Sequence, residues 1–253
     1  MPTPAPVRRT GNPGLNDKTF ANLPRPLAGE ARMTVQGTIN KSFLMLVVLL
    51  ASALWPWSQY LSTGEASAVS TSVLIGTLGG FVLALVISFK ATLAPYLSLP
   101  YAALEGLAIG GISALLERRY PGIAIQAVGL TFGVLAVLLV AYRAGLIRAT
   151  QRFRAIVVGA TGAIALLYLV SIVLSLFHIT VPVLNDSSPL GIILSLVIVA
   201  VAALNLVLDF DLIESGAAQG APRYMEWYAS FGLLVTLVWL YLEILRLLSK
   251  ARR

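Results

Sequence analysis

Seven long apolar segments dominate this sequence, and each can cross a lipid bilayer as a helix. They are residues 42–60, 69–89, 91–116, 122–142, 155–177, 189–213 and 227–248. A helix rises about 1.5 Å per residue, so about 20 residues cross roughly 30 Å of hydrocarbon. The second and fifth segments contain no charged residue, which is rare for helices in the core of a soluble protein. The sequence therefore predicts an all-α polytopic membrane bundle of seven transmembrane helices.

The composition agrees with a membrane protein and excludes several kinds of chemistry. Of the 253 residues, 58% are hydrophobic and 11% are charged, whereas about a quarter are charged in soluble domains. So few charges cannot cover the surface of a soluble globule, which excludes a water-soluble enzyme. The chain has no cysteine, and this rules out disulfides, thiolate metal sites and cysteine nucleophiles.

The positive net charge is concentrated outside the apolar segments. Residues 1–40 combine basic residues with Pro, Gly and Asn and contain no apolar run. They predict a disordered basic cytoplasmic tail that is not a signal peptide, followed by a membrane domain over residues 41–250. Because the basic residues lie in tails and loops, we expect no nucleic-acid partner for the net charge of +7.

The distribution of Lys and Arg predicts the orientation in the membrane. With the amino terminus in the cytoplasm, twelve basic residues lie on the cytoplasmic side and six on the other, as the positive-inside rule requires. We therefore expect a multi-pass protein of the cell inner (plasma) membrane with a cytoplasmic amino terminus. A re-entrant last segment, giving six spans and two cytoplasmic termini, is the alternative. Pro95 and Pro100 predict a kinked or partly re-entrant third segment.

Acidic residues inside the apolar segments are the candidate functional residues, because a charge in hydrocarbon is costly unless it is paired, neutralised or hydrated. Glu105 lies near the middle of the third segment, Asp209 and Asp211 lie in the sixth, and Glu226 begins the seventh. The last three share the cytoplasmic level, whereas Glu243 lies about 25 Å from Glu226 along the helix. We interpret Glu243 and Glu214 as hydrated residues at helix ends. Glu105 is either a structural hydrogen-bonding group or part of an ion path.

Asp209 is the deepest acid of the sixth segment, and Asp211 lies about 200° around the helix from it. Two carboxylates held together in a medium of low dielectric constant share a proton, whereas a nearby cation keeps both ionised. Lys90, Arg143 and Arg223 are the candidate cations at this level. Either arrangement predicts a latch that responds to protonation.

Sequence patterns of membrane enzymes are missing from this chain. It has no HExxH pair, no GxSxG segment with a histidine as general base for the serine, and no phosphate-binding P-loop. We therefore expect a non-enzymatic protein without a cofactor. Small residues at GxxxG spacing predict close helix packing. They are Gly76 with Gly80, Gly106 with Gly110 and Gly111, and Gly129 with Gly133.

Residues 205–213, NLVLDFDLI, resemble the sixth-helix motif of the Bax inhibitor-1 (YccA-like) family, in which an aspartate follows an apolar run. Asp209 is at the position of that aspartate. The seven segments, the basic amino terminus and residues 231–248 are also similar to this family, so the resemblance covers residues 40–250. Residues 222–228, PRYMEWY, resemble its bacterial Bax inhibitor-1-like branch.

The resemblance implies a proton-sensitive calcium leak, in which two aspartates of helices six and seven and a basic latch close the cytoplasmic side of a pore. Here Leu233 is at the position expected for the second aspartate, so Glu226 or Asp211 is the candidate for the second carboxylate. The protein is therefore expected to contact lipid and to pass or sense calcium or protons. The alternative is a non-conducting interaction protein that binds a membrane protease or another membrane protein through its small-residue faces.

Overall fold

The computed structural model describes residues 31–179, 184 and 186–252. Of the predicted tail, residues 1–30 therefore lie outside the described part of the chain. The first helix begins at residue 35, inside the range assigned to the tail, and the side chain of Thr34 caps it by accepting a hydrogen bond from the Gly37 amide. Such an N-cap satisfies an amide that has no partner within the helix.

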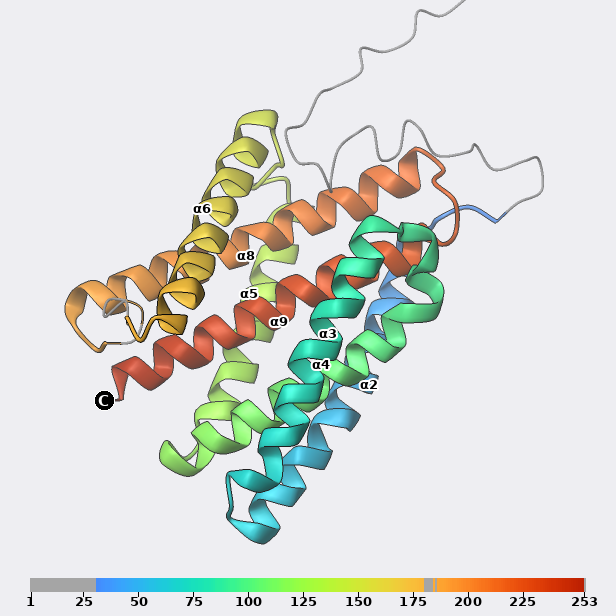
Figure 1. Cartoon of the computed structure of the whole chain (residues 1–253). Coiled ribbons are helices and arrows are strands. Elements are labelled where there is room, and N and C mark those ends of the chain that lie inside the picture. Colours follow the sequence, from blue (N-terminus) through green and yellow to red (C-terminus); the bar gives the residue numbers. More distant parts are fainter. Residues whose placement is uncertain (1–30, 180–183, 185, 253) are drawn as a thin grey trace, which may run out of the picture.

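Seven long helices follow one another along the described part of the chain (Figure 1). They are α2 (Val35–Thr63), α3 (Ser67–Phe89), α4 (Ala94–Arg119), α5 (Ile123–Arg143), α6 (Gln151–Leu176), α8 (Pro189–Ala218) and α9 (Met225–Ala251), and a short 3₁₀ helix, η1 (Ala91–Leu93), joins α3 to α4. All seven are long and apolar enough to cross a membrane. The predicted all-α bundle of seven spans is confirmed.

Neither the third nor the last of the predicted spans is re-entrant in this structure. The prolines of the third span lie within α4, which includes Pro100 and has Pro95 in its first turn, where no amide hydrogen is needed. The last span, α9, is one continuous helix of 27 residues. A re-entrant segment has to reverse its direction, so the six-span alternative does not describe this structure.

The helix α9 is the centre of the bundle. It packs against α2, α4, α5 and α8, and it contains buried side chains along its whole length, among them Met225, Leu234, Leu240 and Leu245. By contrast, α6 lies at the edge beside α8 (Figure 1). Its leucines and isoleucines are largely exposed. In a bilayer these side chains face lipid, where exposure of apolar surface costs nothing.

Glycines allow the closest helix contacts. A Cβ atom at Gly106 or Gly110 of α4 would collide with the backbone of α2, and one at Gly76 of α3 would collide with the backbone of α4. These glycines therefore pack helices together as GxxxG spacing predicts. Around Gly129 and Gly133 of α5, a Cβ atom would meet nothing within 4 Å, so this pair is not used for packing within the described residues.

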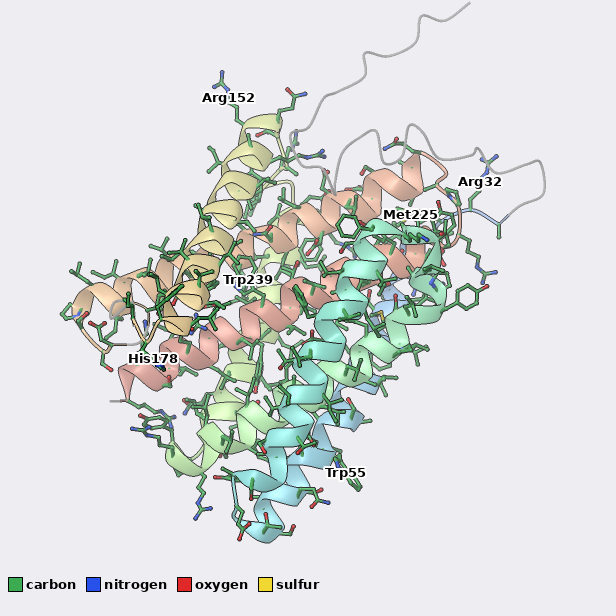
Figure 2. The ribbon with its side chains drawn as sticks, in the orientation of Figure 1. Arg32, Trp55, Arg152, His178, Met225 and Trp239 are labelled. Carbon is green, nitrogen blue, oxygen red and sulfur yellow. The ribbon has the colours of Figure 1, made fainter. Side chains whose placement is uncertain are left out.

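The spans alternate in direction, so the starts of α2, α4, α6 and α9 lie at one end of the bundle, called here the amino-terminal end. The end at which α9 finishes is called the carboxyl-terminal end. At the amino-terminal end the segment before α2 is attached to the α8–α9 loop: the Met33 amide donates to the Ala221 carbonyl at 2.7 Å, and the Arg223 amide donates to the Ala31 carbonyl at 3.2 Å. Arg32 and Met225 accordingly lie close together (Figure 2).

Candidate functional site

Asp209 is a buried carboxylate between α8 and α9. Only 6% of the residue is exposed, and it lies about 14 Å from the end of α8, since nine residues separate it from Ala218. It faces Gly232 of α9, where an added Cβ atom would lie 4.0 Å from Asp209 Oδ1. It also shares a hydrogen bond with the Thr236 side chain. A carboxylate this deep is stable only with further stabilisation from its surroundings.

The second oxygen of Asp209 is what distinguishes the residue chemically. Oδ2 is buried and has no hydrogen-bond partner among the described residues. Buried polar atoms without a partner are rare and costly, and each needs an explanation. A bound proton, a water molecule or a cation would each satisfy Oδ2. Among the described residues, Asp209 is the only carboxylate with a buried oxygen that lacks a hydrogen-bond partner.

Asp211 lies on a different face of α8 and has a partner of its own. It forms an ion pair with Arg154, which is in the first turn of α6, and its side chain is 23% exposed. Asp209 and Asp211 are two residues apart on α8, so their side chains point about 200° apart around the helix axis. Asp211 therefore stabilises the contact between α6 and α8, while Asp209 faces α9.

Glu226 is held by the first turn of α2. It forms an ion pair with Lys41, and it accepts hydrogen bonds from the Thr34 amide and the Thr34 hydroxyl, both at 2.9 Å. Its exposure is 2%. A Cβ atom at Gly37 would collide with the Glu226 carboxylate, so a larger residue there would displace this carboxylate. Together these contacts form an α2–α9 latch, defined by Thr34, Gly37, Lys41 and Glu226.

The structure does not bring Asp209 and Glu226 together. Asp209 faces Gly232 and Thr236, which follow Glu226 by six and ten residues, or about 9 and 15 Å along the helix. Glu226 and Asp211 each have a basic partner instead. The hypothesis that one of them is the second carboxylate of a shared-proton pair with Asp209 is therefore not supported by the geometry.

The basic partners also differ from the predicted ones. Among the described residues, Lys90, Arg143 and Arg223 form no ion pair with these acids, whereas Lys41 and Arg154 do. Because α2 begins at Val35, Lys41 lies on the helix, two turns in, and can reach α9. The sequence interpretation had placed Lys41 just before the first span, where it had no assigned contact.

Glu105 lies apart from the other candidates, between α3 and α4. It is half-buried, shares a hydrogen bond with Tyr101, and approaches Gly80 of α3, where a Cβ atom would lie 2.9 Å from its Oε1. Tyr101 in turn packs edge-on against Phe231 of α9, with ring centroids 4.9 Å apart. These contacts favour the structural alternative for Glu105.

Glu243 was missed by the sequence interpretation, which placed it at a hydrated helix end. It is 2% exposed, and it has partners on both α6 and α9. The Tyr168 hydroxyl of α6 donates to it at 2.6 Å, Trp239 Nε1 donates at 3.3 Å, and Arg246 forms an ion pair at 3.3 Å. Figure 2 shows Trp239 on α9 where α6 crosses it. The Arg246 three residues later was the only local sign of this cluster.

Lys250 is a second buried charge that the sequence interpretation missed. It is 3% exposed and donates to the Gly191 carbonyl at 3.0 Å and to the Ser195 hydroxyl at 2.9 Å. It therefore holds the end of α9 against the start of α8. Across residues 31–179, 184 and 186–252, no group of three or more acidic or histidine side chains could hold a metal ion.

The chain is similar to a known protein family. The family model described as Bax inhibitor 1 like matches residues 9–253, nearly the whole chain. Neither the curated proteins nor the solved structures contain a match to this chain.

Proposed function

The chain belongs to the Bax inhibitor 1 like family, and from this premise we propose that it is a cation leak channel or sensor in which Asp209 binds the proton or the cation. Seven apolar helices make it a multi-pass membrane protein in contact with the lipid bilayer. The observation that carries the proposal is the buried Asp209 Oδ2, which lacks a partner among the described residues. Calcium is the proposed cation, as the family resemblance implies.

Thr236 supports a change of protonation at Asp209. Its hydroxyl oxygen lies 3.2 Å from the Gly232 carbonyl and also hydrogen-bonds with Asp209. A hydroxyl group has one hydrogen to donate and two lone pairs to accept with. It can donate to an ionised Asp209, or accept from a protonated Asp209 while donating to Gly232. Asp209 therefore keeps its hydrogen bond with Thr236 in both protonation states, and only the charge of the Asp209 side chain changes.

The α2–α9 latch is the proposed gate at the amino-terminal end. It lies about two to three turns nearer that end than Asp209, on the helix that also contributes Thr236. Protonation of Glu226 removes the ion pair with Lys41 and frees the first turn of α9 from α2. We therefore expect the rate of cation leak to rise when the latch is released.

The proposal is tested by calcium flux into vesicles that contain the purified protein and an enclosed calcium-sensitive dye. Wild type is expected to admit calcium with a rate that depends on pH. Asp209→Asn, which keeps the shape but removes the titrating charge, is expected to lose that dependence. Glu214→Gln is the matched control, since Glu214 is an exposed acid at the same end of α8. The proposal would be contradicted if wild-type vesicles admitted no calcium, or if the pH dependence of calcium entry were unchanged in Asp209→Asn.

A second candidate function is a non-conducting interaction protein. The observation in its favour is the pair Gly129 and Gly133 on α5, which presents a small-residue surface that no described part of the chain packs against. Such a surface suits close approach by a helix of another membrane protein. Tight vesicles together with a partner that is lost in Gly129→Leu would favour this function over the leak.

A further inference from the structure

A cavity of about 920 Å³ lies at the amino-terminal end of the bundle, and Asp209 is not among its lining residues. Its walls come from α2, α5, α8 and α9, and the α5–α6 connection lies across its mouth. The helices α2 and α5 both pack against α9 but scarcely touch one another. The cavity therefore has an opening towards the surrounding lipid, between α2 and α5.

The body of the cavity is apolar and about as deep as one leaflet of a bilayer. On α2 it extends from Val35 to Leu46, and on α5 from Leu135 to Arg143. These stretches correspond to about 16 Å and about 12 Å of helix. Half of a hydrocarbon core of roughly 30 Å is about 15 Å. An acyl chain of one leaflet therefore matches the depth of this wall.

The mouth of the cavity is positively charged. Arg143 and Arg148 line it and are exposed, and neither forms an ion pair within the described residues. The acids beside them already have partners: Asp211 pairs with Arg154, and Glu214 accepts a hydrogen bond from the Tyr142 hydroxyl at 2.6 Å. These three guanidinium groups and two carboxylates give a net charge of +1. The mouth therefore favours an anion and disfavours a cation.

Ser42 is an independent sign of a ligand. It lines the cavity, is 8% exposed, and its hydroxyl is buried with no hydrogen-bond partner among the described residues. A serine hydroxyl on a transmembrane helix usually donates to a backbone carbonyl or to a neighbouring polar group. An ester carbonyl of a lipid lying along the wall would accept this hydrogen.

We propose that the cavity binds one anionic phospholipid, with its phosphate group between Arg143 and Arg148 and one acyl chain along the apolar wall formed by α2 and α5. The lipid would come from the leaflet at the amino-terminal end and would fill the gap between the two helices. This site is separate from the proposed leak, because none of its walls includes Asp209 or Glu226.

The test measures lipid retained by the purified full-length protein in a neutral detergent. Dioleoyl phosphatidylglycerol or dioleoyl phosphatidylcholine is added, and bound molecules are counted by native mass spectrometry. Wild type is expected to retain the anionic lipid preferentially. The variant R143Q/R148Q is expected to bind it about thirtyfold more weakly, since each basic residue contributes about a fivefold attraction. Either single variant, with about a fivefold loss, provides the same test if the double variant is unstable.

The matched control is R152Q/R223Q, which removes the same charge at the same end. Both arginines are exposed and outside the cavity lining, and Arg152 projects away from the bundle (Figure 2). Little change in lipid retention is expected for this variant, because neither arginine lines the cavity. Leu139→Trp, which fills the apolar body, is expected to weaken binding of both lipids, whereas Leu166→Trp on the exposed face of α6 is not.

Two results would overturn the proposal. Equal retention of phosphatidylglycerol by wild type and R143Q/R148Q would mean that the lipid is held only at the general surface. Displacement of the lipid by inorganic phosphate at an equal concentration would mean that the mouth binds a free anion without an acyl chain. Thermal unfolding of each variant shows whether the fold is retained, as expected for substitutions of exposed arginines.

Discussion

Lys41 and Glu226 form an ion pair that is nearly out of reach of water, since their side chains are 15% and 3% exposed. Two hydrogen bonds from Thr34 satisfy the same carboxylate. A buried ion pair contributes little net stability relative to an apolar pair, but removal of one partner leaves a costly unpaired charge. The latch therefore adds little net stability to the protein, but each of its two charged residues is costly to remove alone.

Removal of the lysine alone should be costly. Lys41→Met is expected to lower the free energy of unfolding by about 3–5 kcal/mol because Glu226 is left charged and buried. Lys41→Met with Glu226→Gln should recover most of this loss. Lys90→Met is the control, since Lys90 is exposed and forms no ion pair within the described residues. Denaturant titration in detergent measures all three, and equal losses for Lys41→Met and Lys90→Met would contradict the latch.

The Glu243 cluster allows a second test of a buried acid. Tyr168→Phe removes one donor and leaves Trp239 and Arg246 in place. A loss of about 1.5–3 kcal/mol in the free energy of unfolding is expected, as for other hydrogen bonds to charged groups. Tyr96→Phe, which alters a tyrosine that is 75% exposed, should change stability by less than about 0.5 kcal/mol. A similar loss in both variants would argue against the contact between α6 and α9.

Close packing of α2 on α4 depends on glycine at the contact. Gly110→Ala places a Cβ atom against the backbone of Ala53, so the helices must separate. A loss of about 1–3 kcal/mol is expected from this overpacking. Gly129→Ala on α5 is the matched control: its Cβ meets nothing, and alanine is the better helix former by about 1 kcal/mol. In thermal unfolding in detergent, the melting temperature should therefore fall for Gly110→Ala and rise for Gly129→Ala.

The positions of helices were more predictable from sequence than their contacts. A span is identified by its own apolar length, and all seven spans were predicted, although α2 begins at Val35, seven residues before the predicted start, and α8 ends five residues after its predicted end. The contact of Lys41 with Glu226 joins residues 185 positions apart, and that of Tyr168 with Glu243 joins residues 75 apart. Such contacts depend on which helices are neighbours and on their rotation, neither of which apolar segments specify. Asp209 stood out in the sequence by its depth in the sixth segment and by the family resemblance, and the structure shows that it is buried; its role in ion passage stays a prediction.

Taken as a whole, the bundle has chemically distinct ends. The amino-terminal end has the latch, the Arg154–Asp211 pair and the basic mouth of the cavity. The carboxyl-terminal end has the buried Glu243 cluster and Lys250. Asp209 lies between the two ends in depth, and under the proposed function a cation that enters at the latch would reach this carboxylate next. The proposed function therefore requires a fixed orientation in the membrane.

The orientation can be measured by labelling introduced cysteines, because the chain contains no cysteine of its own that would be labelled. A single cysteine is introduced at Glu65 in one variant and at Gln219 in another; both positions are exposed and lie at opposite ends of the bundle. With the amino terminus in the cytoplasm, a membrane-impermeant maleimide should label Glu65→Cys in intact cells. Gln219→Cys should be labelled only after permeabilisation. The reverse pattern would contradict the orientation expected from the basic residues.

The most direct test of the central claim is an infrared titration of Asp209 in reconstituted membranes. The account predicts a band of a protonated carboxyl group that is present in wild type and missing in Asp209→Asn. Its midpoint should coincide with the midpoint of the pH-dependent calcium leak measured in the same vesicles. A band that does not change with pH, or a midpoint well separated from that of the leak, would show that Asp209 does not control the passage of cations.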